Sequence, residues 1–271
     1  MLKILMYIKY FMSYLLSVSY KEPILAAKEI IHYFLMNRLL GKKYNITIRF
    51  GENNFLMPNE HQAFYTLHEV FTRDLYTKLQ WCHHVLDLWW FIGDTWVRLA
   101  QHNQSVSIYE PNISNFQFLE KNTLRYNNIK VYNWAVVGDK SKDKLYYEGW
   151  DFNASGKVVN YKTDKKIKTY MIADILWIET YDWLKMDIEW WEYDIINYCI
   201  KNNIFPFKKG YIEFHHYQDA IKIKIIDGFI EYLYGKSYTI EFEDVEGWAI
   251  YYEDINNINP KVFILYFESC E

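Results

Sequence analysis

The feature that most constrains the fold of this 271-residue chain is an alternation of strand-like and helix-like segments that begins near His84. Short apolar runs are typical of buried strands, and apolar residues at helical spacing are typical of packed helices. Strands are expected at 85–88, 106–109, 130–137, 183–188, 211–214, 238–242, 248–252 and 262–267, helices at 95–102, 113–126, 192–202 and 220–234, and a hairpin at 144–161. This order predicts an α/β fold with a mostly parallel sheet and an antiparallel edge.

The N-terminal part has a different pattern. Residues 26–40 and 61–79 carry apolar side chains at helical spacing, and 44–50 alternates like a short strand. We therefore expect a mainly helical extension over 1–80, followed by a single α/β domain over 81–271.

Residues 1–20 are apolar and aromatic, but Lys3 and Lys9 interrupt them. The apolar run after Lys9 is shorter than the roughly 20 residues that span a bilayer, and no small-residue cleavage site follows it. A helix that docks on the domain is favoured over contact with a membrane surface, because a strong cationic face is missing.

Composition limits the classes of partner and the compartment. The net charge is −4 and the isoelectric point is about 6.1, so the chain has no global basic field and a nucleic-acid partner is not expected. The three cysteines form no CxxC pair, which predicts neither disulfides nor a zinc site and favours a reducing cytoplasm. Aromatic residues make up 20 %, and they could fill the core or coat a surface that meets a partner.

In a parallel sheet, ligands bind beyond the carboxyl ends of the strands, so candidate motifs are expected there. The first expected strand ends near Asp87, and Gly93, Asp94 and Thr95 follow in a loop that leads into a helix. A strand-end carboxylate and helix N-terminal amides together suit a zwitterionic amino-acid group. Asp94 or Thr95 could equally be a simple helix cap.

Two further strand ends carry candidate ligand contacts. Glu110 ends the next strand, where a carboxylate can receive both hydroxyls of a ribose, although a surface glutamate before a proline turn is the alternative. Ala135 is a small residue at the end of a third strand, where a flat purine could lie, although an ordinary buried strand is the simpler interpretation.

The last two motifs carry groups for acid–base chemistry. Asp187 and Glu189 follow a strand and precede a helix, so they could orient a substrate hydroxyl or amine, or one could act as a general base. The alternative is that Glu189 and Glu192 simply favour the helix N-terminus. His215 is a possible proton acceptor, although a structural histidine is more common. No metal site is predicted, because His83 and His84 have no third ligand at a suitable spacing.

Taken together, these motifs resemble the FkbM family of methyltransferases from about residue 85 to 242. The markers are DL and IGDT within 87–95, YEPN at 109–112, NWAVVGD at 133–139, ASG at 154–156, LKMDIE at 184–189, EYDII at 192–196 and IEFHH at 212–216. Their order and spacing are more specific than any one of them. The resemblance implies a Rossmann-like class I methyltransferase sheet, S-adenosylmethionine as methyl donor, and O-methylation of a small molecule or a glycan.

Carried over by position, the resemblance implies a donor site and a transfer site. The donor site would comprise Asp87, Leu88, Trp89, Gly93, Asp94, Thr95, Glu110, Pro111, Asn112 and Ala135, and the transfer site Asp187, Glu189 and His215. The acceptor and the oligomeric state are left open. A nicotinamide-dependent oxidoreductase is disfavoured, because the chain lacks a G-x-G-x-x-G turn.

The sequence departs from the family at two places. Family members usually have glycine and a small residue where this chain has Trp89–Trp90 and Trp190–Trp191. Glycine is used there because the backbone approaches the ligand closely and can need a positive φ. The tryptophans could block the pocket in an altered protein, mark a natural protein that has become a binding partner, or line a shifted site and stack on the ligand.

Overall fold

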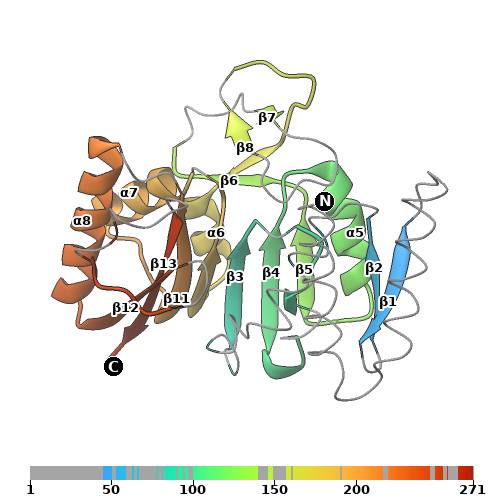
Figure 1. Cartoon of the computed structure of the whole chain (residues 1–271), viewed down its shortest axis with the longest axis horizontal. Helices are drawn as coiled ribbons and strands as arrows, with labels where there is room; N and C mark the ends of the chain where they lie inside the picture. The colour runs from blue at the N-terminus through green and yellow to red at the C-terminus, as the bar shows by residue number, and fades with distance from the viewer. Residues whose placement is uncertain are drawn as a thin grey trace, which may run out of the picture.

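A computed structural model describes most of the α/β part of the chain and little of the first 80 residues (Figure 1). The described residues are 45–50, 53–58, 63, 66, 78, 81, 83–89, 91–93, 95–96, 100–139, 146–148, 157–159, 161–189, 191–215, 219–244, 248–252, 255 and 262–270. The expected helices over 1–40 lie outside these residues, as do most of the helix expected at 61–79 and the positions Trp90, Asp94 and Trp190.

Within the described residues, a seven-stranded sheet has the order β12-β13-β11-β10-β3-β4-β5. The strands are β3 (His84–Leu88), β4 (Ser105–Tyr109), β5 (Ile129–Tyr132), β10 (Trp183–Met186), β11 (Lys209–His215), β12 (Tyr238–Asp244) and β13 (Val262–Ser269). The pairs from β5 to β11 are all parallel, and β13 is antiparallel to both of its neighbours. This is the Rossmann-like sheet of class I methyltransferases, mostly parallel with an antiparallel edge, as the sequence predicted.

The direction in which successive strands are added reverses between β3 and β10. From β3 the chain adds β4 and β5 on one side, and it then returns to add β10 and β11 on the other. The carboxyl ends of β3 and β10 therefore lie side by side, with Met186 in register with Leu88. A crevice forms where strand order reverses, so this edge is the expected position for a ligand.

Both faces of the central strands are buried, which explains their continuous apolar runs. Side chains alternate between faces: Leu86, Leu88, Leu184 and Met186 belong to one buried cluster. The other face has its own cluster, formed by Val85, Trp96, Val106, Ile108, Leu119, Trp183, Tyr211, Ile264 and Tyr266. By the same alternation, Asp87 and Lys185 share the second face.

Four helices of the described residues accompany the sheet. Their bounds are α5 (Ile113–Thr123), α6 (Ile172–Ile178), α7 (Glu192–Asn202) and α8 (Ala220–Gly235). The helices α7 and α8 bury apolar residues in the first cluster and lie beside β11 to β13, whereas α5 lies beside β5 at the opposite end of the sheet (Figure 1). Side chains cap two of them, since Asn112 accepts from the Ser114 amide and Asp219 from the Ile221 amide.

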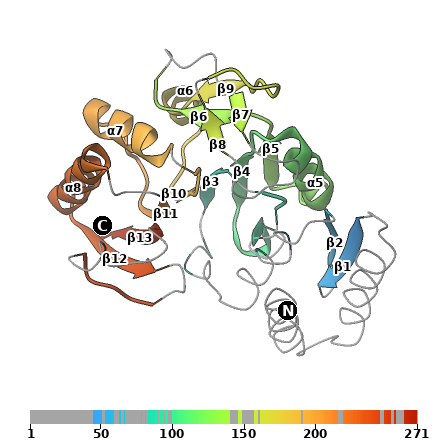
Figure 2. The same cartoon turned by 45° about the horizontal axis from the view of Figure 1, so that its top comes forward.

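Smaller sheets lie outside the main one. β6 (Ala135–Val137) pairs with β9 (Thr169–Met171), β7 (Tyr146–Glu148) pairs with β8 (Lys157–Val159), and β1 (Ile46–Phe50) pairs with β2 (Asn53–Met57). Figures 1 and 2 show β6 and the β7–β8 hairpin grouped beyond the carboxyl ends of β3 and β4. The predicted hairpin at 144–161 is therefore confirmed.

Two predicted strands were wrong. Residues 130–137 do not form one strand, because the chain leaves the main sheet after β5 and Ala135 begins β6, which pairs with β9. Residues 248–252 form no strand in the described part of the chain, where only an isolated bridge joins Ala249 to Glu243. In the first case the apolar run continues past Tyr132, whose partner Tyr109 is the last residue of β4.

Candidate active site

The candidate site lies at the carboxyl ends of β3, β10 and β11, where strand register brings polar side chains onto one face. Lys185 is in register with Asp87 on β3 and with Tyr211 on β11. Side chains two residues apart on a strand point to the same face. Asp187 thus follows Lys185 on this face, and Glu213 and His215 follow Tyr211.

A buried lysine joins the two strand-end aspartates. Lys185 and Asp87 have fully buried side chains, and the Lys185 Nζ lies 3.8 Å from Asp87 Oδ1 and 3.6 Å from Asp187 Oδ2. The same ammonium donates to the Trp89 carbonyl at 3.3 Å, and the Trp96 indole donates to Asp87 Oδ2. Asp87 therefore already receives protein donors, which fixes the end of β3.

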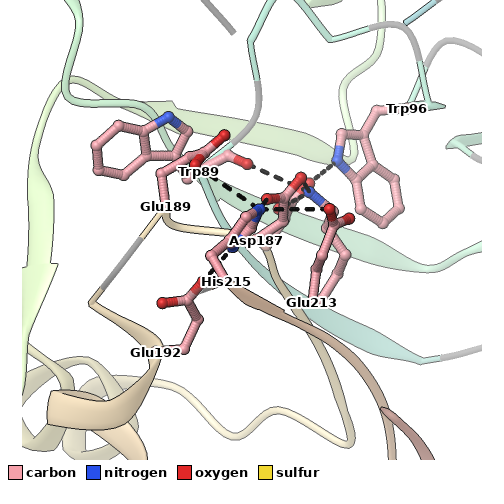
Figure 3. A network of polar contacts seen from close by, with 9 residues as sticks. Trp89, Trp96, Asp187, Glu189, Glu192, Glu213 and His215 are labelled. Carbon is pink, nitrogen blue, oxygen red and sulfur yellow. Dashed lines mark hydrogen bonds and ion pairs between the residues drawn. The ribbon is translucent and has the colours of Figure 1, made fainter. Parts of the chain in front are cut away.

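His215 lies at the centre of a group of four carboxylates (Figure 3). Its Nε2 lies 3.3 Å from Glu213 Oε1, 3.6 Å from Asp187 Oδ1 and 3.7 Å from Glu189 Oε2, while Nδ1 contacts Glu192 Oε1. Glu192 is the first residue of α7 and is fully buried. The Tyr193 hydroxyl donates to the His215 carbonyl at 2.7 Å, which ties the end of β11 to the same helix.

The crowding of acids shifts several pKa values. Burial, together with the neighbouring Asp187 and Glu213, raises the pKa of Glu189 to about 8, although His215 opposes the shift. Burial raises the pKa of Glu213, and the charge of Asp187 adds to it. Burial alone would lower the pKa of His215, but the Glu192 and Glu213 carboxylates outweigh it, so this pKa lies well above its usual value.

Glu110 occupies the carboxyl end of β4 and is fully buried. Its Oε1 accepts from the Asn112 amide at 2.8 Å and from Asn115 Nδ2 at 3.5 Å. Its Oε2 is buried, and no described residue makes a hydrogen bond to it. Burial raises the pKa of Glu110 well above its usual value, with the Asp87 charge adding to the shift. A buried acceptor of this kind is costly unless a ligand or water satisfies it.

Trp89 stands at the turn after β3, where the family resemblance implies glycine. Its φ is +76°, in the left-handed region that favours glycine, and its side chain is 5 % exposed. The backbone amide donates to the Tyr109 carbonyl at 2.8 Å, which holds the turn against β4. At the second departure, Glu189 has φ +46°, and the Trp191 indole donates to the Val158 carbonyl of β8 at 2.7 Å.

The remaining predicted donor-site residues are placed as follows. Leu88, Thr95, Pro111, Asn112 and Ala135 are all buried, and Ala135 lies on β6 and not in the main sheet. Gly93 has φ +86°, and a Cβ there would lie 2.8 Å from Leu119 Cδ1 of α5, so both backbone angle and packing require glycine. These placements leave the predicted roles in donor binding as predictions.

Lys185 and Glu192 are site residues that the sequence motifs did not predict. A lysine in the middle of an apolar strand, as in WLKM, is an available signal, since a strand buried on both faces places it in the core. Glu192 was interpreted as a residue that favours a helix start, and its contact with His215 joins segments 23 residues apart.

No protein-family model and no curated protein matches the sequence. Among solved structures, the chain is similar to a methyltransferase FkbM from Methylobacillus flagellatus KT, with 16% identity over 76% of this chain and 54% of that one and a TM-score of 0.44. It is also similar to an rRNA methylase from Streptococcus thermophilus (11% identity, 73% and 94%, TM-score 0.44). A third is M. jannaschii TYW2 in complex with AdoMet (13% identity, 84% and 88%, TM-score 0.42).

One expectation about partners needs correction. From the net charge no nucleic-acid partner is expected, but the similar structures include an rRNA methylase and a dimethyladenosine transferase from Plasmodium falciparum. The physical reason is that a net charge of −4 describes the whole molecule and says nothing of a local binding surface. The exclusion of a nucleic-acid partner is therefore withdrawn.

None of the helices in the described part of the chain is long and apolar enough to cross a membrane. Contact of residues 1–20 with a membrane surface stays a prediction, because those residues lie outside the described ranges. The cytoplasmic location stays a prediction as well.

Proposed function

We propose that this protein is an S-adenosylmethionine-dependent methyltransferase that methylates a hydroxyl group of a small molecule or a sugar. The observation that carries the proposal is the buried Oε2 of Glu110, which no described residue satisfies. This carboxylate ends the strand beside β3, on a sheet with the strand order of class I methyltransferases. A ribose hydroxyl that donates a hydrogen bond to this Oε2 would remove the cost of burying an unsatisfied acceptor.

The turn after β3 supports the same donor position. Trp89 and Gly93 both have positive φ, the backbone region that glycine adopts without strain, and the resembling family usually has glycine at the position of Trp89. Asn112 adds a polar group on the same side, since its buried Nδ2 has no hydrogen-bond partner among the described residues. In this proposal Glu110 and Asn112 hold the ribose, and the Gly93 loop holds the methionine part.

Asp87 would act differently from the sequence-based expectation. Its carboxylate contacts Lys185 and the Trp96 indole and is fully buried. We therefore assign it to fixing the loop after β3, because a carboxylate without exposed surface reaches a ligand ammonium only if these contacts rearrange.

The bound donor would supply an electrophilic methyl group, and the protein's task would be to hold the acceptor in line with it. Asp187, Glu189 and His215 point toward one another at the neighbouring strand ends (Figure 3). A carboxylate in this arrangement can orient an acceptor hydroxyl and take its proton as the new bond forms.

A second candidate function is a non-enzymatic binding protein whose donor pocket is blocked. The observation that favours it is the burial of Trp89, whose indole belongs to the same buried cluster as Leu88, Tyr109 and Ala135. The resemblance assigns Trp89, Leu88 and Ala135 to the donor site. An indole held there permanently would occupy the space of the donor.

Calorimetric titration with S-adenosylmethionine, and separately with its demethylated product, distinguishes the two. We expect the unmodified protein to bind both, and Glu110→Ala to bind about tenfold more weakly, since the loss of one partner of a buried hydrogen bond costs about 1–3 kcal/mol. Glu120→Ala, an exposed position on α5, is the matched control and should bind as the unmodified protein does.

If the unmodified protein does not bind S-adenosylmethionine, the Trp89→Gly variant shows whether the indole is the cause. Binding by this variant alone would show that the donor site exists and that the indole blocks it, which supports the second candidate. Failure of both proteins to bind would make the donor assignment wrong. Where binding is found, methyl transfer is then assayed with hydroxylated small molecules, sugars and RNA, and transfer to RNA alone would overturn the proposed acceptor class.

A further inference from the structure

The group around His215 has the composition of a metal site. One ligand atom from each of Asp187, Glu213 and His215 can be chosen so that all three lie within 4.8 Å of one another. Two carboxylate oxygens and one imidazole nitrogen form a mixed set that suits a divalent transition-metal ion. Glu189 adds a third carboxylate on the same side of the ring.

The separations match those of ligands around an ion. The distances from His215 Nε2 to carboxylate oxygens of Glu213, Asp187 and Glu189 are 3.3, 3.6 and 3.7 Å. These exceed the roughly 2.7–3.2 Å of ordinary N–H···O hydrogen bonds. Four ligands held at about 2.1 Å in a tetrahedron lie about 3.4 Å apart, which falls within the observed spread.

The histidine is held as metal-binding histidines usually are. Glu192 contacts Nδ1 from the far side, so Nε2 is the nitrogen that faces the three carboxylates. A carboxylate behind the ring fixes its orientation and tautomer and raises the basicity of the free nitrogen. Glu192 is fully buried, and its second oxygen, Oε2, has no hydrogen-bond partner among the described residues.

Charge balance favours a cation at the same place. Among the described residues of this site, Asp87, Asp187, Glu189, Glu192 and Glu213 are acids, and Lys185 and His215 are the bases within ion-pair distance of them. Burial of uncompensated charge is costly, so added positive charge would be stabilising. The side chains of Asp187 and Glu213 are 28 % and 20 % exposed, which leaves a path for an ion from solvent.

We propose that Asp187, Glu213 and His215, with Glu189 as a fourth ligand, bind one divalent transition-metal ion. Zn²⁺ should bind more tightly than Mn²⁺, in line with the general affinity order. Mg²⁺ should bind most weakly, because it prefers oxygen ligands in a near-ideal octahedron. Glu192 is then a positioning residue that acts through His215.

The test is calorimetric titration of the tag-free, chelator-treated full chain with ZnCl₂, and with MnCl₂ followed also by electron paramagnetic resonance. We expect one site per chain. His215→Gln and Glu213→Gln should each abolish it, and Glu192→Gln should weaken it about 10–100-fold, as is typical when a group that orients a ligand is lost. Glu241→Gln, whose side chain is 62 % exposed on β12, is the matched control and should bind normally.

Cobalt substitution gives a readout that a purely structural role would not change. The visible spectrum of the Co²⁺-loaded protein should report nitrogen and oxygen ligands, and it should change in Glu192→Gln without disappearing. His215→Gln could unfold the chain, so circular dichroism accompanies every variant and Glu213→Gln serves as the second ligand variant. Absence of binding at millimolar metal, or binding that both ligand variants retain, would overturn the proposal.

The metal site does not depend on the donor assignment, and two variants separate them. Glu110→Ala should lose affinity for S-adenosylmethionine and keep the metal, whereas Glu213→Gln should lose the metal and keep the donor. Failure of donor binding alone would leave the metal proposal standing.

Discussion

At the scale of single residues, the site depends on charges that the fold removes from water. Lys185 and Asp87 are fully buried neighbours, and their pairing offsets part of the desolvation cost of each. Glu110, which also feels the Asp87 charge, has no cation within ion-pair distance among the described residues. The buried Glu110 carboxyl group therefore does not stabilise the fold, but it can form a hydrogen bond with a ligand.

The burial of Glu110 gives a prediction about stability and pH. Its pKa is raised in the folded protein, so the folded state retains the proton that the unfolded chain releases near pH 4.5. The stability associated with the protonated acid is therefore full below that pH and is lost as the pH rises toward the folded pKa, by up to about 1.4 kcal/mol per pH unit. Glu110→Gln imitates the protonated acid and should avoid this loss.

We therefore expect Glu110→Gln to melt close to the unmodified protein at pH 4 and clearly above it at pH 7.5, as measured by differential scanning calorimetry. Glu120→Gln on the exposed side of α5 provides the comparison and should show no such difference. A melting-temperature difference that is the same at both pH values would show that folding does not raise the pKa of Glu110.

At the scale of elements, Gly210 and Gly228 differ in the space available for a side chain. Gly210 on β11 has no room for a side chain, since a Cβ would lie 2.3 Å from Phe267 Cζ on β13 and 2.9 Å from the Leu184 carbonyl on β10. A Cβ added to Gly228 within α8 would meet no other atom within 4 Å. Gly210→Ala should destabilise the protein by about 1–3 kcal/mol through overpacking. Gly228→Ala should stabilise it by about 1 kcal/mol, because alanine is the better helix former.

Urea unfolding followed by circular dichroism measures both changes, and each variant serves as the other's control. The same direction of change in both variants would contradict the assigned packing of the sheet. The pair also tests the antiparallel edge, because the contact of a Gly210 Cβ with Phe267 exists only where β13 is inserted between β11 and β12.

The sequence predicted most elements of the sheet because its strands are buried on both faces and its helices on one. The helix predicted at 192–202 is α7 as observed, and β10 and β11 differ from the prediction only at their ends. The prediction missed β9 and α6. The strand β9 was missed because Thr169–Met171 has no long apolar run and because its partner, β6, was expected in the main sheet. Pairing partners decide such short strands, and local patterns do not contain that information.

The candidate site was predicted in part. Strand-end carboxylates at Asp87, Glu110 and Asp187 follow from the rule that ligands bind at carboxyl ends, and they lie there. The convergence of Glu213 and Glu192 on His215 could not be read from spacing, because it depends on the register of β11 and on the start of α7. The positive φ of Trp89 likewise contradicts residue preference and is imposed by the surrounding structure.

At the scale of the whole molecule, the two proposed sites share one edge of one sheet. The donor residues follow β3 and β4, and the metal ligands follow β10 and β11, so they lie on opposite sides of the point where strand order reverses. Lys185 and Asp87 connect them through the core. Such a division would let one half of the sheet hold a donor while the other holds an acceptor.

This division predicts how ligands change hydrogen exchange across the molecule. Binding of S-adenosylmethionine should slow exchange in peptides that cover the end of β3, the end of β4 and the start of α5. The bound ligand would suppress the local unfolding through which these backbone amides exchange. Binding of Zn²⁺ should instead slow exchange at the end of β11 and the start of α7, where His215 and Glu192 meet. The edge strand β12 should change with neither ligand, since it is separated from both groups by β13.

Hydrogen exchange followed by mass spectrometry measures all three regions in one experiment. Glu110→Ala and Glu213→Gln are the matched controls, and each should lose the response to only one ligand. Protection that spreads equally over both halves with either ligand would mean that the edge acts as one site.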